Sequence, residues 1–183
     1  NLGFGAGFYT VFVYAVSYME RVGKLSDQIS LRNNSMAMLL LLVIMPFAAK
    51  YADRHGRKVV LGVGFSLLTL LPIPLFHLMG LGIPWLIIVC DLALALPLGI
   101  VGGAIAACNV ELMPQAVRCT GLAFAYNLAV GGFGGITPLA VTWLTVYLHS
   151  PTAPGYWVAG AAMISAFTLW FLVAETRHRS LDH

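Results

Sequence analysis

The sequence carries few charges, and its three cysteines form no recognisable pattern. Only 9% of its 183 residues are Asp, Glu, Lys or Arg, whereas a soluble protein has about a quarter. The net charge of +3 is too small and too scattered to indicate nucleic-acid binding. The cysteines have neither metal-ligand spacing nor a close pair, so neither a metal centre nor a disulfide framework is predicted.

Catalytic signatures are also missing. The sequence has no Ser-His-Asp order, no glycine-rich phosphate loop and no site with paired carboxylates. Asp91 and Glu111 are expected at different membrane depths, so they cannot easily share a catalytic task. We therefore predict that the chain is not an enzyme and has no cofactor. It begins at Asn1 without Met or a basic leader segment, and we expect it to be part of a longer protein.

Long apolar runs make up most of the chain. It is 60% hydrophobic with a mean hydropathy of +0.87, and a soluble fold of this composition would expose large apolar patches. The runs are continuous and not alternating, which favours helices over a barrel. The sequence predicts an all-α membrane protein, a six-transmembrane-helix bundle in one domain, 1–183, surrounded by lipid. The predicted spans are 2–18, 36–51, 59–79, 83–109, 117–148 and 156–174.

The charged turn, residues 53–58 (Asp-Arg-His-Gly-Arg-Lys), separates the second and third spans, and five of its six residues are ionisable. Seven basic residues fall on its side of the membrane and three on the other: Lys50, Arg54, Arg57, Lys58, Arg118, Arg177 and Arg179, against Arg21, Lys24 and Arg32. Short loops rich in Lys and Arg face the cytoplasm. We therefore expect a multi-pass protein of the cell (inner) membrane with both ends of this segment cytoplasmic.

Small residues recur in the later spans. Gly99 and Gly103 are four residues apart, as are Gly131 and Gly135, and this spacing lets helix backbones approach closely. Pro138 removes a backbone hydrogen bond in the fifth span, which is also too long for a straight crossing, so a bend or a tilt is predicted. Two interpretations of the glycine-rich fifth span stay open, namely simple helix packing and a moving pathway.

The charged turn also has two interpretations. One is a conformational latch, in which Asp53 lies against the positive N-terminal end of the fifth span and pairs with Arg. In that case Glu111 and Arg118 pair with each other or with the charged turn. The other is a solvated loop that only sets orientation in the membrane. The candidate latch residues are Asp53, Arg54, Gly56, Arg57, Lys58, Glu111 and Arg118.

Five residues within the spans are candidates for a solute or proton pathway: Tyr9, Asp91, Tyr126, Asn127 and Pro138. A carboxylate at the depth of Asp91 costs a few kcal/mol unless it is paired, protonated or hydrated. Asp91 is therefore either a proton or cation site that faces an internal cavity, or a residue close enough to the outer headgroups to be hydrated. Tyr9 and Asn127 are the better candidates for lining a path.

The charged turn resembles a loop of the major facilitator superfamily, whose pattern is Gly-x-x-x-Asp-Arg-x-Gly-Arg-Arg or -Lys. The turn matches this pattern, with Ala49 in place of the leading Gly. Segment 111–118 is similar to the family's Glu-x-x-Pro-x-x-x-Arg turn, and Glu175-Thr176 is similar to its closing Glu-Thr. The resemblance implies a twelve-helix parent in which this chain is the C-terminal half, with the solute bound between it and an N-terminal six-helix half.

A narrower resemblance, to the metabolite–proton symporter group of citrate, 2-oxoglutarate and proline/betaine carriers, is carried by Phe8-Tyr9, Phe133–Pro138 and Pro154–Trp157. It implies half of a proton-coupled secondary transporter that moves a small organic acid or a zwitterionic metabolite by alternating access. No basic residue lies deep in the spans, so an organic acid would find its positive partner in the other half. A zwitterion could instead use the aromatic face of Tyr9. The alternatives are an uncoupled facilitator of the same fold and a non-transporting six-helix scaffold.

Overall fold

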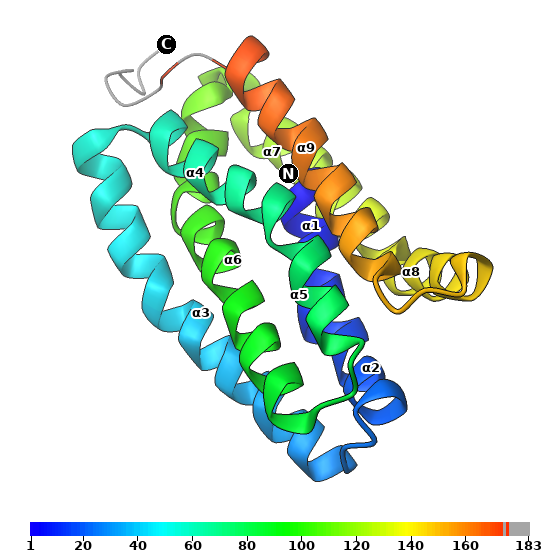
Figure 1. Ribbon diagram of the computed structural model, residues 1–183. Helices are drawn as coiled ribbons and strands as arrows, with labels where there is room; N and C mark the ends of the chain where they lie inside the picture. Colours follow the sequence, from blue (N-terminus) through cyan, green and yellow to red (C-terminus); the bar gives the residue numbers. More distant parts are fainter. Residues whose placement is uncertain (174, 176–183) are drawn as a thin grey trace.

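The structure is a computed structural model that describes residues 1–173 and 175. Within these residues, six helices are long and apolar enough to cross a membrane, and they form an all-helical bundle (Figure 1). The predicted fold class is therefore confirmed. Residue 174, the predicted end of the sixth span, and the basic tail residues Arg177 and Arg179 lie outside the described residues.

Several of the spans are composed of more than one helical element. The first consists of α1 (Leu2–Tyr9), the π-helix η1 (Thr10–Tyr14) and α2 (Ala15–Val22), and the second is α3 (Asp27–His55). The third consists of α4 (Arg57–Leu70) and α5 (Pro72–Met79), and the fourth is α6 (Pro84–Leu112). The fifth consists of η2 (Gln115–Val117), α7 (Arg118–Tyr126), the π-helix η3 (Asn127–Gly134) and α8 (Gly135–Leu148), and the sixth is α9 (Ala153–Leu172).

The second helix begins earlier than the sequence predicted. Its apolar run starts at residue 36, but α3 begins at Asp27, directly after an extended Ser26, and Asp27 places a negative charge in the first turn. Arg32, which we had assigned to a loop, therefore lies on α3. Hydropathy marks the part of a helix that prefers lipid, whereas the helix itself continues through polar residues for as long as its backbone hydrogen bonds do.

The charged turn is compact because a single residue separates α3 from α4. Gly56 has a φ of +108°, a conformation that side chains rarely adopt. A Cβ atom at Gly56 would also lie 2.9 Å from the carboxyl carbon of Glu175. The reversal between the second and third spans therefore requires glycine at this position.

The fifth span is irregular next to Pro138, where a bend or a tilt was predicted. Pro138 has no N–H to donate to the carbonyl of Gly134, and Gly134 is the last residue of η3. The wider π-helix thus occupies the turns just before the proline. The first span contains a second π-helix, η1, which the sequence did not predict.

The packing places α6 at the middle of the bundle. It lies along α3 on one side and against α4 and α5 on the other, while α9 covers α1, α4 and α5 (Figure 1). Burial differs strongly between spans: 67% of the apolar window of the first span is buried, against 22% in the second and 17% in the fifth. Broad faces of α3 and of the fifth span are therefore open.

The two glycine pairs behave differently. A Cβ atom on Gly99 would lie 2.8 Å from the Cβ atom of Ile44, and one on Gly103 would lie 2.8 Å from the Cβ atom of Ala48. Both glycines therefore set the close approach of α6 to α3, as their spacing predicts. Gly135, by contrast, has no described atom within 4 Å of such a Cβ position.

Candidate functional site

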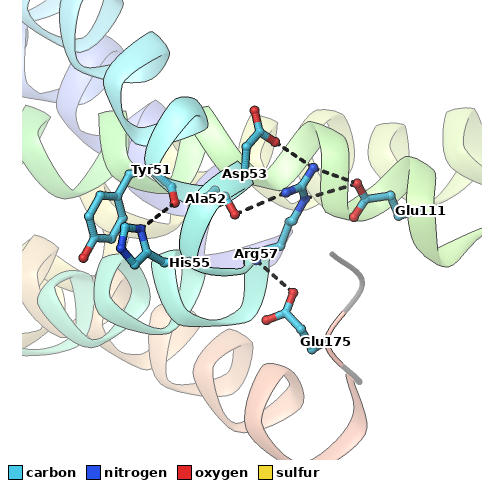
Figure 2. A network of polar contacts seen from close by, with 7 residues as sticks. All are labelled: Tyr51, Ala52, Asp53, His55, Arg57, Glu111 and Glu175. Carbon is cyan, nitrogen blue, oxygen red and sulfur yellow. Dashed lines mark hydrogen bonds and ion pairs between the residues drawn. The ribbon is translucent and has the colours of Figure 1, made fainter. Parts of the chain in front are cut away.

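The charged turn forms a network around the guanidinium of Arg57, which comes from the start of α4 (Figure 2). Nη2 lies 2.7 Å from Oδ1 of Asp53 and 3.0 Å from Oε1 of Glu111, and Nε donates to the same Glu111 oxygen at 3.1 Å. Nη1 donates to the carbonyl of Ala52 at 3.2 Å. Arg57 thus joins the ends of α3 and α6 to the start of α4.

Two helix ends are capped at the same place. The carboxylate of Glu175 accepts a hydrogen bond from the backbone N–H of Arg57 at 2.9 Å (Figure 2). It accepts another from the backbone N–H of Lys58 at 3.2 Å, where the helix dipole of α4 favours a negative charge. Lys58 Nζ donates to the carbonyls of Trp170 (3.1 Å) and Val173 (2.8 Å) at the end of α9. The sequence indicated Glu175 only as part of a closing motif and missed this capping role.

Three of the predicted latch residues, Asp53, Arg57 and Glu111, are brought together by their charged groups, with one change of partner. Asp53 is 65% exposed and pairs with Arg57, one turn further along, whereas we had expected the start of the fifth span to be its partner. Of the two predicted partners for Glu111, the structure shows the charged turn, through Arg57. Arg118 Nε donates across the turn to the carbonyl of Met113 at 3.2 Å, and Arg54 is exposed. Whether the group acts as a latch stays a prediction.

A second polar group, the buried polar cluster, consists of Ser30, Asn33 and Asn34 on α3 and Asp91 on α6. Asp91 has no exposed surface, and its Oδ2 accepts a hydrogen bond from Nδ2 of Asn33 at 2.7 Å. An Asp91 hydrated by headgroups does not fit this burial. The sequence missed the three α3 residues because we assigned their segment to a loop, although their i, i+3, i+4 spacing places them on one helix face.

The remaining pathway candidates lie elsewhere. Tyr9 is partly buried against η3, where a Cβ atom on Gly134 would lie 2.8 Å from Cδ2 of its ring. Asn127 is exposed and donates to the carbonyl of Ala123 at 2.8 Å, and Tyr126 is 39% exposed. Tyr9 therefore packs on the fifth span, which also carries Tyr126, Asn127 and Pro138, while Asp91 lies against α3.

Two of the segments that carry the narrower resemblance contact each other. The rings of Phe133 and Trp157 are stacked, with centroids 5.3 Å apart and planes at 10°. The indole Nε1 of Trp157 donates to the hydroxyl of Thr137 at 3.1 Å. Sequence reasoning treated the two segments separately, because a contact between spans leaves no local pattern.

In the described part of the chain, no group of three or more His, Cys, Asp or Glu side chains could hold a metal ion. Six apolar spans and a polar network at one end define a multi-pass membrane protein. A family model described as "Sugar (and other) transporter" matches residues 3–183. The chain belongs to this transporter family of the major facilitator superfamily, as the charged turn predicted.

Among the curated relatives, the citrate-proton symporter of Klebsiella pneumoniae is 31% identical over 90% of this chain and 37% of its own length. The ectoine/proline transporter ProP of Corynebacterium glutamicum is 26% identical over 92% of this chain and 34% of its own length. A putative proline/betaine transporter of Staphylococcus aureus is 28% identical, with coverages of 94% and 37%. The chain thus spans about a third of the length of the relatives it matches. No solved structure gives a significant match.

Proposed function

We propose that this chain is the C-terminal half of a proton-coupled secondary transporter that moves a small organic acid or a zwitterionic metabolite by alternating access. One observation carries the proposal. The family match runs along residues 3–183, and the bundle that it matches leaves the second and fifth spans open. In such transporters the solute binds between two packed halves, which rock around it. The open faces suit contact with an N-terminal six-helix half.

The orientation follows from the basic residues. Five basic residues lie at the helix ends on the charged-turn side of the bundle: Lys50, Arg54, Arg57, Lys58 and Arg118. Short segments rich in Lys and Arg stay on the cytoplasmic side during membrane insertion, so we place the charged turn in the cytoplasm. The cell (inner) membrane is the proposed location. The buried polar cluster, near the starts of α3 and α6, then lies in the outer half.

The solute class is narrowed by charge. Among the described residues, no Lys, Arg or His side chain is buried in the bundle. An organic acid therefore requires a positive partner from the other half, whereas a zwitterion has Tyr9 and Tyr126 within this half as aromatic surfaces. We favour a small organic acid because the Phe133–Pro138 segment resembles that of citrate carriers.

The charged turn is proposed to hold one conformation closed on the cytoplasmic side. Arg57 joins three helix ends. Breaking its pair with Glu111 leaves the Glu111 carboxylate without this charged partner, although that side chain is only 14% exposed. Charge-assisted hydrogen bonds of this kind are strong, and a network of them has two discrete arrangements, made and broken. Movement of α6 relative to α3 and α4 would select between these arrangements.

The test of transport is uptake by the intact carrier, this chain together with the N-terminal half, reconstituted in liposomes with radiolabelled citrate, proline and betaine as probes. We expect an inward proton gradient to drive accumulation of one probe, and a protonophore to abolish it. Accumulation without any dependence on the gradient would identify an uncoupled facilitator. No uptake of any of the three probes, by protein that is monodisperse and inserted, would favour the non-transporting scaffold.

The test of the latch is Asp53→Asn in the same assay. We expect reduced uptake at normal expression, because the exposed carboxylate contributes to the made arrangement and little to folding. Asp27→Asn is the matched control, since Asp27 is an exposed acidic residue at the opposite end of α3. Uptake by Asp53→Asn equal to that of the control would rule the latch out.

A further inference from the structure

The buried polar cluster has an unusual shortage of hydrogen-bond donors. Four buried side-chain atoms have no hydrogen-bond partner among the described residues, and all four are oxygens of this cluster: Ser30 Oγ, Asn33 Oδ1, Asn34 Oδ1 and Asp91 Oδ1. Ser30 and Asp91 have no exposed surface, and Asn33 is 3% exposed. Native structures leave few buried polar atoms unpaired, so four in one cluster require an explanation.

The helix geometry gathers these oxygens. Ser30, Asn33 and Asn34 are at positions i, i+3 and i+4 of α3, where neighbouring Cβ atoms lie about 5–6 Å apart. Residues at these spacings share one face of a helix, so Asn33 and Asn34 lie one turn beyond Ser30 on the same side of α3. The hydrogen bond from Asn33 Nδ2 to Asp91 Oδ2 holds the Asp91 carboxyl beside them, at 2.7 Å.

The Asp91 carboxyl has no cationic partner. The ion pairs found among residues 1–173 and 175 all involve Arg57, at the other end of the bundle. The titratable and charged groups on the elements packed against α6 near Asp91 form no ion pair with its carboxyl. Cys90 is a thiol, and Tyr14 and Tyr18 bond to Thr145 and Pro151. Glu20 on α2 is partly exposed, and the remainder are exposed: Arg21, Lys24, Asp27, Arg32 and His77. A lone buried carboxylate is costly, and a bound cation removes that cost.

We propose that the buried polar cluster binds one small monovalent cation, with Asp91 Oδ1 supplying the charge and Ser30, Asn33 and Asn34 supplying neutral oxygens. This inference rests on the proposed ion-coupled transport, for which it names the ion site. Oxygen is the ligand of hard cations. Two cations share this chemistry. A proton would protonate the Asp91 carboxyl, whose O–H would then donate a hydrogen bond to a neighbouring oxygen. A sodium ion would instead be coordinated by several of the four oxygens.

The site also reaches the first span. Asn34 Nδ2 donates to the carbonyl of Phe12 at 3.2 Å, and Phe12 lies within the π-helix η1. When Asn34 Oδ1 binds the cation, both polar atoms of the Asn34 amide have partners, because Nδ2 donates to the η1 backbone. The cation thereby stabilises the position of η1 as well. Asn34 is thus a positioning residue between the ion and the π-helix η1 of the first span.

The first experiment measures ion binding without any solute. The purified protein is unfolded thermally in detergent in two series. In the first, the NaCl concentration is raised while choline chloride keeps the ionic strength constant. In the second, sodium is absent and the pH of the buffer is lowered from mildly alkaline to mildly acidic. A cation that binds the folded state raises the unfolding midpoint. We expect a rise in one of the two series, which identifies the cation. We also expect Asp91→Asn to abolish that rise, and the surface control Asp27→Asn to retain it.

A second variant covers the case in which Asp91→Asn does not fold. Ser30→Ala keeps the charge and removes one neutral oxygen, so we expect it to need about tenfold more cation for the same rise. Ser35→Ala is its control, because Ser35 is exposed on the same helix and bonds to the carbonyl of Leu31. Equal responses of Ser30→Ala and wild type in both series, or of Asp91→Asn and wild type, would overturn the site.

Failure of the site and failure of transport are distinguishable. A cation-dependent midpoint with no uptake of citrate, proline or betaine would retain the site and contradict the transporter. Uptake that stays coupled to an ion gradient in Asp91→Asn would retain the transporter and contradict the site. If both proposals hold, Asp91→Asn loses gradient-driven accumulation while it still exchanges the solute across the membrane.

Discussion

Replacing Gly103 by alanine tests whether α3 and α6 are held in contact by the absence of a side chain. The added Cβ atom would lie against the carbonyl oxygen of Met45, 2.8 Å from the Cβ atom of Ala48 and 2.9 Å from the backbone nitrogen of Ala49. The first and last of these are backbone atoms of α3. Contacts with backbone atoms cannot be relieved by a change of rotamer, so the whole of α3 has to shift.

The magnitude follows from two opposing terms. Forcing an extra carbon into a packed core costs about 1–3 kcal/mol. Alanine in place of glycine in a helix interior returns about 1 kcal/mol. Because the clash is with backbone, we expect the cost near the top of its range and a net destabilisation of about 1–2 kcal/mol. Gly160 is the matched control, since it lies within α9 and a Cβ atom there would have no described atom within 4 Å.

The assay is thermal unfolding of the purified protein in detergent, followed by the loss of the monodisperse peak on size exclusion. Gly103→Ala should unfold at a lower temperature than wild type, and Gly160→Ala at the same or a higher temperature. If Gly103→Ala matched Gly160→Ala, the close approach of α3 and α6 would not be the structural constraint that we infer, and the position of Asp91 beside Asn33 would need another cause.

Three further predictions use the same unfolding assay. Glu111→Gln should lower stability by about 1–3 kcal/mol because the guanidinium loses a charged, partly buried acceptor, whereas Asp53→Asn should cost at most about 1 kcal/mol because that pair is exposed; the reverse order would contradict the network. Trp157→Phe should keep the ring stack and lose about 1 kcal/mol with the bond to Thr137, and no loss would show that bond to be unimportant. Lys58→Met should cost about 0.5–1 kcal/mol by uncapping α9, and an unchanged midpoint would show that water replaces the lysine.

Much of the architecture could be predicted because lipid imposes simple rules on the chain. Every spanning segment must satisfy its own backbone and be apolar for about 20 residues, so continuous hydrophobic runs reveal the spans directly. The charged turn stands out for the opposite reason, as a cluster of charge between two such runs. The irregular fifth span was predictable from Pro138, since a missing N–H is a local property of the sequence.

The parts that could not be predicted depend on contacts between spans or on polar helix. Residues 27–35 were assigned to a loop because they are polar, yet they form the first turns of α3 and include Ser30 and Asn33. The stack of Phe133 on Trp157 joins residues from different spans. The partner of Asp53 depended on the distance to another helix, and its own neighbour Arg57 proved nearer.

The seam between α3 and α6 is fastened at both extremities, by Asn33 and Asp91 at one and through Arg57 and Glu111 at the other. Asp91 and Glu111 are separated by about 30 Å along the helix axis, roughly the thickness of the hydrocarbon layer. Two rods joined in this way pivot as one beam, and a swing of about 10° carries the far tip through about 5 Å over that length. If the charged turn latches one conformation as proposed, a swing of the two fastened helices would carry the buried polar cluster with it, so the two polar ends of the seam would move together.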